Sequence, residues 1–281
     1  MYSDSRRRLA LGCLAGAIVL AAADIHARPA APLRVCADPN NLPFSNRQQE
    51  GFENRLASLA ASDLGRPLQY FWQPQRRGFL RTTLNAGNCD LVVGVSRGLD
   101  AVATTRAYYR SAYVFVQRAT VRPALHSFDD HRLRTMAIGV QVTGEDYNNP
   151  PATQALAFRQ LTKHVVGFPV YGNYAEASPQ RAVVDAVAKG DVETAVVWGP
   201  VAGYFAMHET PRLLVSTIGA DVDRSGAPMT FDIAMAVRRE DVGLKTVLDQ
   251  FLERRRTDIN ALLERYGVPL LPVRSASGGE R

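Results

Sequence analysis

Cysteine and histidine are scarce in this chain of 281 residues, which contains only three of the former and five of the latter. The histidines fall singly along the sequence, and no two cysteines have the CxxC spacing of a redox motif or of many zinc sites. Chemistry that depends on a reactive dithiol or a bound metal ion is therefore not expected. We predict no metal site in this chain.

Lysine is also scarce. The chain has only Lys163, Lys189 and Lys245, and the rest of its basic residues are arginines apart from the histidines. The formal net charge is +6, but the arginines are spread along the chain and do not gather with aromatic residues on one face. A nucleic-acid-binding protein would concentrate them or carry a reading motif. We therefore expect no nucleic-acid partner.

The N-terminal region has the plan of an export signal. Three arginines at 6–8 precede the uncharged stretch 9–23, and Ala27 supplies a small residue at a plausible cleavage point. We predict a signal peptide over 1–27 and a periplasmic mature chain, with a retained N-terminal anchor as the alternative. The arginines also resemble a twin-arginine signal, although a leader of the general export pathway explains them equally. No later apolar run approaches the ~20 residues of a membrane-spanning helix, so no stable span is expected.

The first part of the mature chain alternates strand and helix. Residues 33–37 form a strand candidate, and the proline and asparagine residues that follow begin a loop because they cannot continue a sheet ladder. Apolar residues recur at helical spacing over 56–64, and Gly65 supplies a left-handed stop. A second helix is predicted from Phe79 to its end at Gly87. The apolar run 89–95 follows it and predicts a strand covered on both faces.

The same plan repeats farther along the chain. Strands are predicted at 135–140 and 165–170, the second ending at a proline that favours a sheet edge, and a helix is predicted between them at 153–161. A clearer helix has Ser178 as its predicted N-cap and Gly190 as its stop. Another apolar strand, a return strand and one or two closing helices complete the chain.

A chain that builds one α/β half, crosses, builds a second half and returns leaves a cleft between the halves. We therefore predict an α/β protein with the two-lobed fold of periplasmic binding proteins, in which helices flank a mostly parallel sheet in each lobe. The predicted lobes comprise residues 28–117 plus 232–281 and residues 118–231.

The cysteines allow one disulfide. Removal of the leader takes away Cys13 and leaves Cys36 and Cys89 as an even pair in an oxidising compartment. Both lie in or beside strands that should be neighbours, so the pair is a disulfide candidate, although the sequence does not give their separation. Two buried, unbonded cysteines are the alternative.

Four motifs carry a closer resemblance, namely VCADPNNLPFSN at 35–46, PQRRGF at 74–79, NAGNCD at 85–90 and TTRAYYRS at 104–111. In this order they resemble the J proteins of methanol-oxidation clusters, called MxaJ, XoxJ or MoxJ, within the solute-binding proteins of the polar amino acid type (family 3, type II). The resemblance covers nearly all of the mature chain. Ala107 departs from it, because the family pattern has proline there.

The resemblance implies a periplasmic accessory protein that assembles or activates a methanol dehydrogenase dependent on pyrroloquinoline quinone (PQQ), beside its cytochrome c. The partner would carry the PQQ and a calcium or lanthanide ion, whereas this chain would bind no cofactor. The motifs do not separate a calcium enzyme from a lanthanide enzyme, nor a chaperone from an activator.

Amino-acid receptors of this fold hold the ligand carboxylate with an arginine shortly after the strand at 91–95, because a guanidinium fork matches a carboxylate. The segment 96–102 has no arginine at the equivalent spacing, although Arg97 could reach the cleft by another path, so we expect amino-acid binding to be lost. Trp198 is the first cleft candidate, because it ends a parallel strand where the crevice should lie. All the predicted cleft residues are Asn41, Phe44, Trp72, Arg76, Ser96, Tyr108, Tyr147, Trp198 and Tyr204.

Two enzyme hypotheses and one receptor hypothesis compete with the accessory role. Gly94, Ser96 and Gly98 match the Gly-x-Ser-x-Gly pattern of a nucleophile elbow, but the residues that follow lack the helical periodicity that an elbow needs. A dehydratase of this fold could use Asp38 or Glu145 as general acid. We favour a chain without catalytic residues, and a solute receptor of an importer remains the main alternative.

Overall fold

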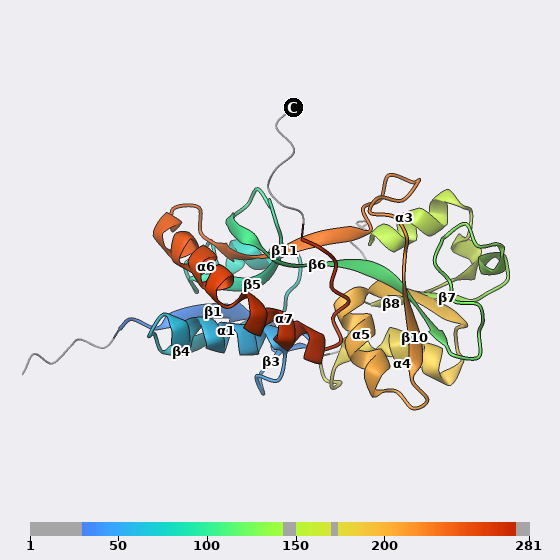
Figure 1. Ribbon diagram of the computed structural model, residues 1–281, viewed down its shortest axis with the longest axis horizontal. Coiled ribbons are helices and arrows are strands. Elements are labelled where there is room, and N and C mark those ends of the chain that lie inside the picture. Colours follow the sequence, from blue (N-terminus) through green and yellow to red (C-terminus); the bar gives the residue numbers. More distant parts are fainter. Residues whose placement is uncertain (1–29, 143–149, 170–173, 274–281) are drawn as a thin grey trace, which may run out of the picture. The chain divides into compact units, whose positions relative to one another are not determined.

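A mixed sheet of nine strands runs through the part of the chain that the computed structural model describes, which comprises residues 30–142, 150–169 and 174–273 (Figure 1). The chain divides into two units, Met1–Ala30 and Ala31–Arg281, and the sheet belongs to the second. Its strands are β1 (Leu33–Ala37), β4 (Leu68–Trp72), β5 (Leu91–Ser96), β6 (Ala103–Arg118), β7 (Ile138–Val142), β8 (Val165–Pro169), β9 (Thr194–Trp198), β10 (Leu213–Thr217) and β11 (Thr230–Val237).

The helices flank this sheet, and two very short strands pair with each other outside it. The short strands are β2 (Asn40–Asn41) and β3 (Ser45–Asn46). The α-helices are α1 (Phe52–Asp63), α2 (Phe79–Thr82), α3 (Pro151–Phe158), α4 (Ala182–Lys189), α5 (Gly199–His208), α6 (Val242–Arg254) and α7 (Arg256–Arg265). Turns of 3₁₀-helix occupy His131–Arg134, Thr162–His164 and Pro179–Arg181.

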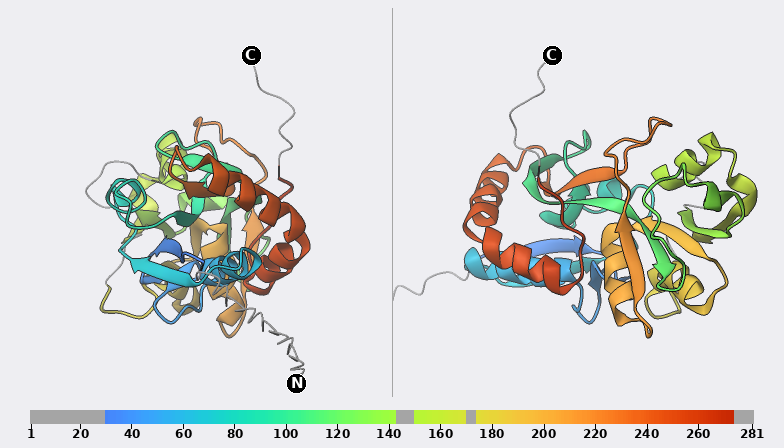
Figure 2. Two further views of the ribbon diagram at one scale, coloured as in Figure 1. Left: turned by 90° about the vertical axis from the view of Figure 1, so that its left-hand side faces the viewer. Right: turned by 45° about the vertical axis from the view of Figure 1, so that its right-hand side comes forward.

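The long strand β6 joins two groups of strands. Its first part pairs antiparallel with β11, which leads through β5 and β1 to β4. Its last part pairs with β9 on one side and β10 on the other, and β9 leads to β7 and β8. Helices α1, α6 and α7 lie beside the first group, and α3, α4 and α5 lie beside the second (Figures 1 and 2). The α/β fold class is confirmed, whereas the predicted lobe boundaries stay a prediction.

Most predicted elements exist, and two details of the prediction are wrong. The second helix was expected to end at Gly87, but α2 ends at Thr82, because Thr83 leaves the helical conformation and its hydroxyl donates to the Phe79 carbonyl at 2.6 Å. Ser178 is not an N-cap with a side-chain hydrogen bond; its backbone is left-handed, and a 3₁₀ turn separates it from α4. Strand β8 lies at the sheet edge, as the proline predicted.

Apolar side chains of the described residues form four clusters, and two of these, one in each strand group, share partly buried neighbours. Phe52 and Phe251 are fully buried in the first, and Phe205 is buried in the second. Burial of a side chain of this size contributes about 1.5–3 kcal/mol. Phe44 and Trp198 are only partly buried and pack against both clusters. These two aromatic residues therefore mark the place where the two cores meet.

The two mature cysteines are bonded. Strands β1 and β5 are parallel neighbours, with Cys36 opposite Val92, and Cys89 lies just before β5. This brings the Cys36 and Cys89 Cα atoms to 5.6 Å and their sulfurs to 2.01 Å. The disulfide left open by the sequence is confirmed.

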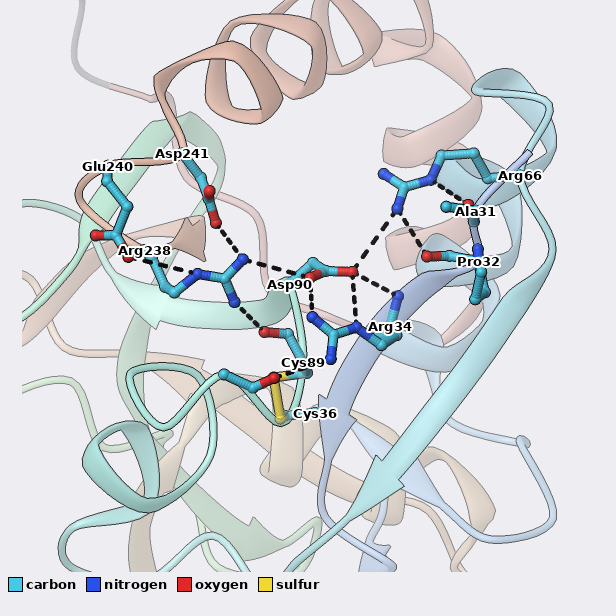
Figure 3. A network of polar contacts seen from close by, with 11 residues as sticks. Ala31, Pro32, Arg34, Cys36, Arg66, Cys89, Asp90, Arg238, Glu240 and Asp241 are labelled. Atoms are coloured by element: carbon cyan, nitrogen blue, oxygen red, sulfur yellow. Dashed lines mark hydrogen bonds and ion pairs between the residues drawn. A yellow bond between two sulfur atoms is a disulfide. The ribbon is translucent and has the colours of Figure 1, made fainter.

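Asp90, the neighbour of Cys89, is the centre of an arginine network (Figure 3). Arg34 donates to Asp90 Oδ1 through Nη2 at 2.5 Å, Arg238 Nη2 lies 3.4 Å from the same oxygen, and Arg66 Nη2 lies 3.7 Å from Oδ2. Burial raises the pKa of Asp90, but the hydrogen bonds from Arg34 outweigh it, so the pKa of this carboxyl lies below its ordinary value. The network fixes the start of β5 to β1 and to the chain after β11.

Replacing Asp90 with asparagine should lower the free energy of unfolding at pH 7 by about 2 kcal/mol, the order of one hydrogen-bonded charge lost to its partners. Because the folded pKa of Asp90 is depressed, its contribution is present above about pH 4, the ordinary value, and disappears as the pH falls below it. Urea unfolding of wild type and D90N should therefore differ at pH 7 and converge in acid. Glu240→Gln, an exposed member of the network, serves as the control, and an equal loss in both variants would contradict the central role of Asp90.

Three sequence predictions lie outside the described residues. They are the signal peptide over 1–27, the cleft candidate Tyr147 and the candidate general acid Glu145. None of the helices in the described ranges combines the length and apolarity needed to cross a bilayer.

Candidate functional site

A cavity of about 780 Å³ opens where the two strand groups meet. It lies near the carboxyl ends of β1, β5 and β9, where parallel sheets commonly bind ligands. Residues of β6 and β11 complete its wall, as do the segments after β1 and β4. Its lining comprises Asp38, Asn41, Phe44, Glu53, Gln75, Arg76, Arg77, Gly78, Phe79, Leu80, Arg81, Gly94, Val95, Ser96, Leu99, Ala101, Tyr109, Tyr113, Tyr174, Gln180, Trp198, Phe231 and Ile233.

Three aromatic rings form a continuous wall of this cavity. Tyr113 on β6 and Trp198 on β9 are register partners in the sheet, so their rings lie side by side at 5.5 Å between centroids. Phe231 on β11 completes the group at 5.7 Å from Trp198 and 6.4 Å from Tyr113. Burial raises the pKa of Tyr113, so its hydroxyl stays neutral. We call these three residues the aromatic wall.

The structure brings five of the predicted cleft residues to the cavity, namely Asn41, Phe44, Arg76, Ser96 and Trp198. Three others lie elsewhere, and the prediction that they face the cleft is corrected. The placement of the five residues does not test whether they bind anything, so their binding role stays a prediction.

Each misplaced residue has a structural reason. Trp72 stacks on Tyr70 at 4.5 Å, outside the cavity lining. Tyr108 and Tyr109 are both buried in the first core with their ring centroids 5.0 Å apart, and only Tyr109 also lines the cavity. The pairing of β6 with β11 shifts register beside these two residues, so the simple alternation of strand side chains does not hold there. Tyr204 on α5 stacks on Tyr266 at 5.7 Å.

Guanidinium groups reach the cavity from a segment other than 96–102, and one of them belongs to Arg76, a predicted cleft residue. The segment 96–102 contributes Ser96, Leu99 and Ala101, and Arg97 is not among the lining residues. Three arginines instead line the cavity from the segment between β4 and the end of α2, and all three are exposed. We call Arg76, Arg77 and Arg81 the arginine rim.

Asp38 has a structural task at the cavity. Its carboxylate is buried and accepts hydrogen bonds from the backbone N–H groups of Asn40 and Gln75 at 2.8 and 2.6 Å, and from the Tyr174 hydroxyl at 2.5 Å. Asn40 in turn donates to the Glu176 carbonyl at 2.7 Å. Asp38 thus connects the loop after β1 to the neighbouring segments. Because its carboxylate is engaged in these hydrogen bonds, it is poorly suited to act as a general acid.

Ser96 also lacks the setting of a nucleophile. It ends β5, and the chain continues in turns through Gly98, whose φ is +78°, into β6. A nucleophile elbow needs a helix directly after the serine. The Gly-x-Ser-x-Gly sequence therefore does not form a nucleophile elbow in this structure.

Glu53 is a site residue that the sequence reasoning missed. It lies in the first turn of α1, and its carboxyl lines the cavity directly above Gly94 of β5. A Cβ atom at position 94 would lie 2.0 Å from Glu53 Oε1, so the glycine makes the room for the carboxyl. Desolvation raises the pKa of Glu53 to about 8, and the charge of Asp38 adds to the rise. A glycine inside an apolar strand was the one available signal of such a close approach.

The described residues hold no group of three histidine, cysteine, aspartate or glutamate side chains arranged as a metal site. The lining of the cavity offers aromatic surfaces, the carboxyl groups of Asp38 and Glu53, and an exposed basic rim.

Solved structures share this architecture. The crystal structure of MxaJ from Methlophaga aminisulfidivorans MPT matches with a TM-score of 0.72 and 26% identity, over 85% of this chain and 100% of that chain. The crystal structure of the periplasmic binding protein XoxJ from Methylobacterium extorquens AM1 matches with a TM-score of 0.69 and 32% identity, over 85% and 99% of the two chains. The protein therefore has the periplasmic binding protein fold, as predicted.

A curated relative places the chain more closely. Protein MoxJ of Methylorubrum extorquens is 33% identical over 256 residues, which are 87% of this chain and 83% of that protein. The chain belongs to the MoxJ family, and the resemblance drawn from the four motifs is confirmed. No protein-family model matches the chain.

Proposed function

We propose that this protein is a periplasmic accessory protein that docks a PQQ-dependent methanol dehydrogenase and assists its assembly or activation. The observation that carries the proposal is a large cavity with an aromatic wall in a chain of the MoxJ family. Aromatic side chains that are only partly buried, such as Trp198, are the anchors that protein partners most often use. In this role the chain binds no cofactor of its own, and the partner carries PQQ with its calcium or lanthanide ion.

The proposed role is non-catalytic. Asp38 is committed to three hydrogen bonds, and Ser96 lacks an elbow helix. An importer's receptor is the competing function, but amino-acid receptors of this fold rely on a guanidinium clamp after β5, and the segment 96–102 supplies none to the cavity.

Trp198→Ala and Phe44→Ala should each weaken binding of the cognate dehydrogenase by at least about tenfold, the usual scale for loss of a buried aromatic anchor. Ser96→Trp should act likewise, because it fills the cavity from an exposed position without removing a core contact. Affinity can be measured by surface plasmon resonance on immobilised dehydrogenase.

Phe158→Ala is the matched control, because Phe158 is an aromatic residue of α3 that is 57% exposed and does not line the cavity. Thermal unfolding of every variant separates a binding defect from a folding defect. Unchanged affinity in folded S96W and W198A proteins would refute docking at the cavity.

A further inference from the structure

The carboxyl of Glu53 is built into the cavity and yet has no protein partner. It makes no hydrogen bond or ion pair with any residue in the described ranges, whereas the nearby carboxylate of Asp38 accepts three. Gly94 leaves open the space that the carboxyl occupies. The Glu53 side chain is half-buried and faces the cavity, and a carboxyl in that position without a protein partner points to a function there.

The groups around Glu53 favour a positively charged ligand. Asp38 from the loop after β1 raises the proton affinity of Glu53 as a like charge, and Tyr70 of β4 together with Tyr108 and Tyr109 of β6 interact with it electrostatically. The three tyrosines have pKa values above their ordinary range because they are buried, so they stay neutral. No cation among the described residues pairs with Glu53, and the three arginines of the rim are exposed.

The aromatic wall also favours a cationic ligand. The faces of tryptophan, tyrosine and phenylalanine attract ammonium groups, and clusters of such rings recognise organic cations. Tyr113, Trp198 and Phe231 line the same cavity as Glu53. A carboxylate for direct pairing and aromatic faces for the surrounding carbon atoms are thus available together.

We propose that the cavity binds an organic ammonium group, which pairs with the carboxylate of Glu53 against the aromatic wall of Tyr113, Trp198 and Phe231. Free α-amino acids fit poorly, because their own carboxylate would lie close to Glu53 and Asp38 with no guanidinium from the segment 96–102 to hold it. A primary amine without an α-carboxylate fits well. Two sources supply this chemistry, a free alkylamine and the side chain of a lysine on a protein partner.

Binding of this kind exchanges one proton for one cation. Below pH 8 the Glu53 carboxyl is neutral, so binding of an ammonium ligand must displace the proton from Glu53. The affinity for an ammonium ligand should therefore rise about tenfold per pH unit up to pH 8 and then level off. A neutral hydrogen-bond acceptor would show the opposite trend, because it needs the protonated carboxyl as donor.

The test is a calorimetric titration of the full chain with n-butylammonium chloride at pH 6, 7, 8 and 9, with 1-butanol as the neutral counterpart. We expect binding of the ammonium probe with the stated pH dependence, release of about one proton at pH 6 and 7 that disappears by pH 9, and at least about tenfold weaker binding of the alcohol. Equal affinity for both probes, or an affinity that falls above pH 8, would overturn the proposal.

Two variants localise the site. Glu53→Gln should abolish both the preference for ammonium and its pH dependence. Gly94→Ala should weaken binding without changing the net charge, because the new methyl group displaces the flexible end of Glu53. Glu264→Gln, which removes the same charge from an exposed position on α7, should bind as wild type does. Undiminished ammonium binding by folded E53Q would refute the assignment.

The two sources are distinguished by a separate arm, which rests on the proposed docking function. Acetylation of the dehydrogenase lysines removes their charge. If the partner's lysine is the ligand, acetylation should weaken docking on wild type and have no further effect on E53Q. If acetylation has no effect while n-butylammonium binds, the source is a free amine. The amine titration does not involve the dehydrogenase, so a failure of docking and a failure of the ammonium site give different results.

Discussion

A chain with both Cys36 and Cys89 replaced by alanine is expected to lose about 4 kcal/mol of unfolding free energy, which is close to the entropy that a cross-link of this span removes from the unfolded chain. The bond closes a sequence separation of 53 residues that contains α1, β4 and α2. Both cysteines are buried against apolar side chains, so alanine avoids burying a new hydroxyl. Guanidinium unfolding under non-reducing conditions measures the loss.

Reduction of the wild type is the matched control for this variant. Dithiothreitol should lower the unfolding midpoint of the wild type toward that of the double variant and should leave the variant itself unchanged. Equal midpoints for the oxidised wild type and the variant would show that the bond contributes nothing to stability.

Glu53→Gln is expected to stabilise the protein by about 3 kcal/mol at pH 9 and to have little effect at pH 4.5. The folded pKa of about 8 lies above the ordinary value of 4.5, so the folded state binds more protons between these two values. The wild type therefore loses stability as the pH rises from 4.5 to 8. At about 1.4 kcal/mol per pKa unit the loss is at most about 5 kcal/mol, and water in the cavity reduces it.

Unfolding free energies at pH 5, 7 and 9 for the wild type and E53Q measure this difference. Glutamine keeps the shape of the side chain and cannot ionise, so its profile should lack the decline. Glu264→Gln is again the control, because it removes the same charge from an exposed position on α7. Parallel profiles for the wild type and E53Q would show that Glu53 is not desolvated in the folded protein.

The elements that the sequence predicts are those with strong local signals. Strand β1 follows from its own apolar residues and from the proline-rich loop after it, and α1 follows from helical spacing and from Gly65, which has a φ of +61°. The disulfide required only that two predicted strands be neighbours. Local chemistry is sufficient in these cases because the deciding residues are close together in the sequence.

The long strand β6 shows why other elements are missed. Its sequence carries Arg110, which reads as a break in an apolar strand. In the fold this arginine is buried, because Asp221 and Thr230 contact it at 2.9 and 2.7 Å from more than a hundred residues away. No local pattern reveals partners at that separation.

The site residues likewise divide into those with a local sequence signal and those that only the fold reveals. Trp198 reaches the cavity as predicted from its place at the end of a parallel strand. Tyr108 was predicted to face the cleft, but Tyr109 lines the cavity, and the register shift between β6 and β11 beside these residues has no signal in the local sequence. Glu53 was missed because an acidic residue in the first turn of a helix is ordinary, and only the fold shows that this one lies over a glycine in a cavity.

The decisive question is whether the cavity serves a partner or a free amino acid. A thermal-shift screen of the protein with the twenty amino acids answers it, because a receptor's ligand at about 100-fold above its dissociation constant stabilises the folded state by about 2.7 kcal/mol. We predict no shift of that size for any of them, since the cavity has no guanidinium clamp after β5. A large shift with one amino acid, held in the cavity by an arginine, would contradict the accessory role and make this protein a nutrient receptor.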